Sequence, residues 1–251
     1  MSPCTADSFV YTVQPGDTLW LLAKRFHTTI QAIISANSFL YGDQLLVGQT
    51  ICIPQNYAPA QTFKPFCFRQ TKMTGQMLNN HLRMLWEQHV YWTRLVILGI
   101  AFDLPDVQLT SERLLRNPSD FEVVLKLFYG GELAAKFAEL FTAHLTIAAE
   151  LVKAAKAGNH AAAADAEKRW YTNADQIAAF LAGINPYWFQ QEWKKMLYDH
   201  LEMTKMEAVE ILTSKYADSI HTFDNIEREA LLMADLIAQG IIRQFPLCFS
   251  V

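Results

Sequence analysis

From about residue 74 onward, a helical repeat of apolar residues leaves little alternative to an all-helical domain. Five long segments follow the 3.6-residue period, and short Gly-, Pro- or Asn-containing pieces separate several of them: residues 76–102, 131–157, 160–183, 189–213 and 217–243. A shorter helix is expected over 118–129, since Asn117-Pro118 is a good start and Gly130 a good stop. Connections this short favour antiparallel neighbours, so the sequence predicts an up-and-down bundle over residues 74–245.

Residues 9–54 follow a different pattern, in which two short strands enclose two short helices. Tyr11 and Val13 alternate as a half-buried strand does, and the turn signal PGD follows them. Two runs with helical spacing come next. The segment Thr50–Ile53 then returns to a strand. The predicted fold class is therefore α+β, a small βααβ module followed by a larger all-α bundle.

Residues 55–73 are expected to link the two domains. Pro59 and Pro65 interrupt this stretch, which shows neither a helical nor an alternating period. The predicted organisation is a module over 9–54, a linker over 55–73 and a bundle over 74–245.

The N-terminal stretch resembles the LysM family of carbohydrate-binding modules, whose fold is βααβ. The matching marks, in order, are YTVQPGDTL, LWLLAKRF, the dipeptide TT, a second helix ending in AN, and VGQTICIP. The resemblance implies binding of chains that contain N-acetylglucosamine, in peptidoglycan or a chitin-like glycan. Backbone amides of two loops would bond the N-acetyl groups, and the leucines would contact apolar sugar faces. The groove would lie between Gly16, Asp17 and Thr18 on one side and Gln44, Leu45 and Leu46 on the other.

The resemblance has one departure, because His27 stands where the family usually has a helix-ending glycine. Histidine tolerates the left-handed conformation less well than glycine, so a slightly strained turn is expected there. The alternative to a glycan-binding module is one that keeps the fold but has lost its ligand. The family fold places its two strands side by side, so a disulfide between Cys4 and Cys52 is expected if the compartment is oxidising. In a reducing cytosol all four cysteines would stay thiols, and the absence of a CxxC pair argues against a thiolate zinc site.

The apolar stripe of each long helix carries one strongly polar residue near its middle: His89, His144, Asn173, His200 and Glu227. Because mid-helix positions of an antiparallel bundle lie at similar height, these residues are expected to meet in one buried layer. Burial without partners would cost about 1–3 kcal/mol each, so they should contact one another or a ligand.

Two interpretations of this layer stay open. Three imidazoles and a carboxylate suit Zn, Fe, Mn or Cu. A metal site would use His89, His144, His200 and Glu227, with Asn173 or Asp175 supporting these ligands or adding one. The alternative is a hydrogen-bonded layer that fixes the register of the helices.

Composition excludes several function classes. A net charge of -4 over 251 residues gives no basic field for nucleic acid or anionic lipid. The most apolar later stretch, Leu95–Phe102, is too short for a membrane span. The first residues lack the basic start and apolar core of a signal sequence, so we expect cytoplasmic synthesis and then association with a spore or cell wall.

The helical part resembles an uncharacterised domain family of endospore-forming Gram-positive bacteria, in the runs LRMLWEQHVYWTRL, EKRWYTNADQIAAFL and INPYW within residues 78–243. The resemblance implies the kind of organism from which the protein comes, and it implies no activity. Two hypotheses result. One is a non-enzymatic wall or spore protein that binds glycan and presents a bundle for protein contacts or homo-oligomerisation. The other is a metal-binding bundle, with or without enzymatic activity, addressed to the wall. A wall hydrolase has less support, since the expected carboxylates lie mostly on solvated faces.

Overall fold

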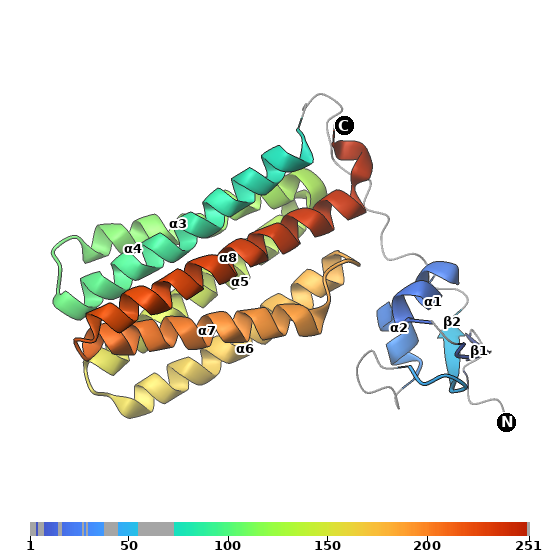
Figure 1. Cartoon of the computed structure of the whole chain (residues 1–251), viewed down its shortest axis with the longest axis horizontal. Helices are drawn as coiled ribbons and strands as arrows, with labels where there is room; N and C mark the ends of the chain where they lie inside the picture. The colour runs from blue at the N-terminus through green and yellow to red at the C-terminus, as the bar shows by residue number, and fades with distance from the viewer. Residues whose placement is uncertain are drawn as a thin grey trace. The chain divides into compact units, whose positions relative to one another are not determined.

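The computed structural model describes residues 4, 8–14, 17–26, 28, 30–37, 45–54 and 73–249. The chain divides into two compact units, residues 1–64 and 65–251 (Figure 1). All of the expected linker except Met73 lies outside the described residues. The predicted fold class is confirmed, because a small two-stranded module precedes a helical bundle.

The N-terminal module has the order strand, helix, helix, strand: β1 Ser8–Thr12, α1 Leu19–Arg25, α2 Ile30–Ser35 and β2 Thr50–Pro54. The strands pair antiparallel, with Val10 opposite Cys52. Their inner faces and the two helices enclose a small apolar core made of Val13, Leu19, Leu22, Ala23, Ile33, Ile51 and Ile53. The order and the core are those expected from the βααβ pattern.

Two buried connections hold β2 in the module. The Asn37 side chain accepts a 2.7 Å hydrogen bond from Cys52 N and donates to Cys52 O at 2.8 Å and to Ile33 O at 2.6 Å. Cys4 and Cys52 form a disulfide with their Cα atoms 5.5 Å apart. Asn37, just beyond the end of α2, is thus bonded directly to the backbone of β2.

The bundle consists of α3 Gly75–Phe102, α4 Val107–Leu115, α5 Asn117–Lys156, α6 His160–Ile184, α7 Gln190–Leu212 and α8 Tyr216–Gln244, then the 3-10 turn η1 Pro246–Cys248. Apart from α4, their bounds agree closely with the predicted segments, and α5 covers two of these. The sequence did not predict α4. Leu114 is the one buried residue of this nine-residue helix, and Val107 packs beside it on the core, so its apolar stripe is too short to stand out. None of the described helices is long and apolar enough to cross a membrane.

The long helices form a closed ring in which α3 packs on α5, α5 on α6, α6 on α7, α7 on α8 and α8 on α3 (Figure 1). Helix α4 packs on α3 and α5. Within α5 the chain reverses at Gly130, whose φ of 79° favours glycine. The Phe121 ring consequently lies 5.4 Å from that of Phe141, across the break. The ring encloses the middle of each long helix, where the predicted polar residues are found.

Candidate functional site

In the N-terminal module, two loops adjoin at one end of the sheet. Val13 N donates to Gln49 O at 2.9 Å, and Gly48 N donates to Val13 O at 2.8 Å. The turn before β2 is therefore bonded to the residue from which the loop after β1 departs. These are the two loops that the sequence places on either side of a groove. Gly16 and Gln44, one predicted residue on each side, lie outside the described residues.

The side chains of Asp17 and Thr18 form hydrogen bonds within the module. Asp17 Oδ2 accepts 2.7 Å hydrogen bonds from Gln14 N and from the Tyr11 hydroxyl. The bond from Gln14 N lowers the pKa of Asp17, and the bond from Tyr11 acts in the same direction. Thr18 Oγ1 caps α1 by accepting from Leu21 N at 3.2 Å. Both side chains shape the loop.

The opposite loop presents apolar side chains to solvent. Leu46 is 70% exposed and Val47 is 64% exposed, whereas Leu45 packs against the module core. The loop backbone is held, because Gln49 Oε1 accepts from Leu46 N at 3.0 Å. A leucine held in an exposed position on an ordered turn offers an apolar contact for a ligand.

In the bundle, three of the predicted polar residues are buried close together. His89 on α3, His144 on α5 and His200 on α7 are each about 97–98% buried. The His89 and His200 rings have centroids 5.6 Å apart, and the Phe141 ring touches both His89 and His144. Burial lowers the pKa of His89 well below its ordinary value, and His200 and His144 lower it further. Within the part of the chain that the structure describes, His89 Nδ1 has no hydrogen-bond partner.

His144 has a buried amide partner. Its Nδ1 lies 2.8 Å from Asn173 Oδ1, and Asn173 Nδ2 donates to Leu140 O at 3.0 Å. Because the amide oxygen faces the ring, His144 Nδ1 carries the proton and donates to it. Burial lowers the pKa of His144 to about 3, although the bond to Asn173 opposes this shift. His144 is therefore a neutral structural imidazole at neutral pH.

The carboxylate predicted for this layer was misassigned. His200 Nδ1 pairs with Glu229 at 2.9 Å, whereas Glu227 lies beside Glu87 at the α3–α8 contact. There, burial raises the pKa of Glu87, and the neighbouring Glu227 raises it further. Asp175 is also away from the histidines, because it bonds Lys194 at 2.8 Å and Tyr198 at 3.1 Å on a half-exposed surface.

Another buried ion pair was missed from the sequence. Glu207 on α7 pairs with Arg94 on α3, and Arg94 also donates to Ser219 O on α8 at 3.2 Å. Burial raises the pKa of Glu207, and Arg94 opposes the rise. Glu207 follows His200 by seven residues on the same helix face, and this spacing was the available signal.

These pairings do not make a metal centre. Among the described residues, no group of three or more His, Cys, Asp and Glu side chains is placed to hold a metal ion. The predicted Zn, Fe, Mn or Cu site built on His89, His144, His200 and Glu227 is thus not supported. The hydrogen bonds join α5 to α6 and α7 to α8 instead, as the structural interpretation of the layer requires.

Comparison with known proteins assigns the N-terminal module. Residues 11–54 match the LysM domain family. A putative L,D-transpeptidase of Bacillus licheniformis, YkuD, is 49% identical over 45 residues, which cover 18% of this chain and 27% of that protein. No solved structure matches the chain. The expected relation of the bundle to a domain of spore-forming bacteria stays a prediction.

Proposed function

Because residues 11–54 form a LysM domain, we propose that the protein binds N-acetylglucosamine-containing glycan of a cell wall or spore through this module. The bundle is presented on the glycan as a non-enzymatic domain. The observation that supports this proposal most directly is the exposure of Leu46, a large apolar side chain that is 70% exposed on an ordered turn. Leu46 would lie against the apolar face of a sugar ring.

The neighbouring loop supports the same role in a different way. Since the side chains of Asp17 and Thr18 are bonded within the module, their contribution to binding would come from the backbone. Backbone amides are suited to the carbonyl oxygen of an N-acetyl group, which accepts hydrogen bonds. Binding would thus combine amide donors on one loop with an apolar contact on the other.

The bundle's buried polar groups are consistent with a non-enzymatic domain. His144, His200 and Glu207 bond to Asn173, Glu229 and Arg94 respectively. Each pair joins two helices of the ring. Their simplest role is to fix the packing of these helices.

Replacing Leu46 by aspartate should weaken glycan binding by at least tenfold, since a leucine contact contributes about 1.5–3 kcal/mol when fully buried. The measurement is co-sedimentation of the full chain with purified peptidoglycan over a range of protein concentrations. Leu232→Asp is the matched control, because Leu232 is an exposed leucine of the bundle, 61% accessible. Equal binding by the Leu46 variant and the unmodified chain would refute the assigned groove.

A further inference from the structure

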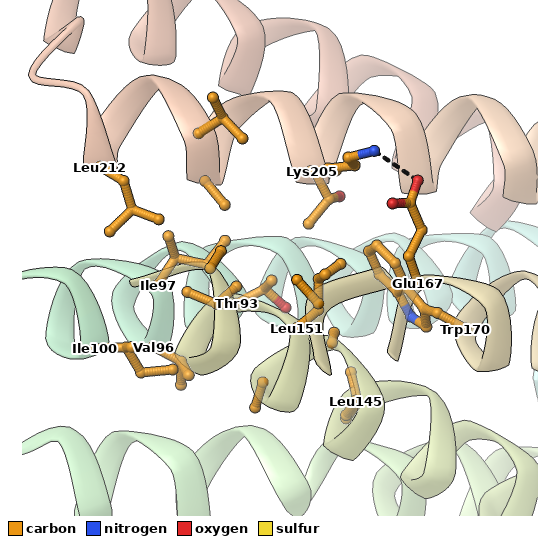
Figure 2. A pocket seen from close by; sticks show the side chains of 18 of the residues that line it. Thr93, Val96, Ile97, Ile100, Leu145, Leu151, Glu167, Trp170, Lys205 and Leu212 are labelled. Carbon is orange, nitrogen blue, oxygen red and sulfur yellow. Dashed lines mark hydrogen bonds and ion pairs between the residues drawn. The ribbon is translucent and has the colours of Figure 1, made fainter. Parts of the chain in front are cut away.

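The bundle contains a cavity of about 120 Å³ that the pairings described above do not fill. It lies one helical turn from the buried histidines, among α3, α4, α5, α6 and α7. Figure 2 shows its wall, which is mostly aliphatic and includes Val96, Ile97, Ile100, Leu145, Leu151 and Leu212. A void with such a wall favours an apolar occupant.

Three polar atoms in the wall have no hydrogen-bond partner among the described residues. They are the Trp170 indole nitrogen and the hydroxyls of Thr93 and Thr204. Trp170 is 3% exposed and Thr204 is 5% exposed, so solvent does not satisfy these groups. Buried polar groups in proteins nearly always have partners. The indole N–H donates only, whereas each hydroxyl donates and accepts, so each of these groups could bond to an oxygen atom of a ligand.

An ion pair flanks the cavity where it approaches solvent. Lys205 Nζ on α7 donates to Glu167 Oε1 on α6 at 2.6 Å, and both side chains are partly exposed (Figure 2). Because the two charges neutralise each other, this opening favours neither an anion nor a cation. The wall and the opening together select an uncharged molecule.

We propose that this cavity is a binding site for a small, uncharged, mainly apolar molecule that carries one oxygen, such as a one-ring or short-chain alcohol. Its hydrocarbon part fills the aliphatic region, and its oxygen bonds to a polar group of the wall, such as the Thr204 hydroxyl. The cavity of about 120 Å³ is somewhat smaller than the cavity of about 150 Å³ that takes up benzene, so a molecule of about one ring is the upper limit. This site is independent of glycan binding by the LysM domain.

Phenol, benzene and benzoate are suitable probes, because they share a ring and differ in the polar group. Titration of the full chain by calorimetry should show one site for phenol. Benzene should bind about tenfold more weakly because it leaves the wall atoms unpaired. Benzoate should bind at least as weakly as benzene, since its charge has no counter-charge to pair with.

Two variants in the cavity wall, with one control variant outside it, test where the molecule binds. Ala208→Leu fills the cavity from α7 and should weaken phenol binding at least tenfold, whereas Ala164→Leu, on the exposed face of α6, should leave it unchanged. Thr204→Val keeps the side-chain shape and should reduce the preference for phenol over benzene, so it tests the site if the leucine variant does not fold. No phenol binding by the unmodified chain would overturn the proposal and indicate that water alone satisfies the wall. Binding that is unchanged in both cavity variants would overturn it as well.

Discussion

Replacing Gly240 by alanine is expected to destabilise the bundle by about 3 kcal/mol or more, the upper range for overpacking a core. Gly240 lies on α8 directly beneath Trp188, and a Cβ added there would overlap the indole ring. The ring cannot easily move, because it is 2% exposed and its Nε1 donates to Leu236 O at 3.1 Å. Urea unfolding followed by circular dichroism measures the change.

The matched control for this substitution is Gly183→Ala. Gly183 is an exposed glycine near the end of α6, and an added Cβ there would meet no atom within 4 Å. Because alanine is the better helix former, this variant should gain up to about 1 kcal/mol. Equal stability of the two alanine variants would contradict the close packing of Trp188 on Gly240.

Acidification should destabilise the bundle through its buried histidines, by about 2 kcal/mol between pH 7 and pH 5 for His144, with a further loss from His89 in the same direction. Both histidines have a pKa lowered by burial, to about 3 for His144. The unfolded chain binds protons at their ordinary pKa of about 6.5. Stability is therefore fully present above pH 6.5 and is lost as the pH falls towards the lowered pKa. Among the described residues, His200, Glu229 and Glu207 are further ionisable groups near this layer, and the pKa of Glu207, which burial raises to about 7, acts in the opposite direction.

The variant His144→Asn isolates the contribution of one histidine. Asparagine does not titrate, and its amide can still donate to Asn173. As the pH is lowered, the free energy of unfolding should therefore decrease less steeply for the variant than for the unmodified chain. Below pH 6 the two slopes should differ by about 1.4 kcal/mol per pH unit. His221→Asn, at an exposed position of α8, should leave the slope unchanged. Parallel pH profiles for the unmodified chain and the His144 variant would contradict the neutral, buried state of this residue.

Sequence periodicity predicted the helices of the bundle because each long helix buries a continuous apolar stripe. It failed for α4, which buries only Leu114. The reversal at Gly130 was also predictable, since glycine tolerates the φ of 79° found there. The depth of His89, His144 and His200 followed from their positions near the middle of antiparallel helices.

The error at Glu227 has a geometric cause. The predicted stripe along α8 runs through Ile220 and Glu227, seven residues apart, whereas the buried face of the helix follows another set of positions with the same spacing. The structure accordingly buries Ser219 and Ile226, one position earlier in each case. Glu227 moves to the flank near α3, and Glu229 on the other flank reaches His200. Which side chains pair at the edges of two packed helices depends on how each helix is rotated about its axis. The apolar stripe of one helix does not specify that rotation.

Glycan binding by the N-terminal module can be tested residue by residue, by titrating the full isotope-labelled chain with a tetramer of N-acetylglucosamine and following backbone amide chemical shifts. We expect concentration-dependent shifts at Asp17, Thr18, Leu45 and Leu46, with the amides of α3–α8 unaffected. Unchanged spectra, or shifts confined to the bundle, would contradict the proposal that this LysM domain carries the protein to its glycan.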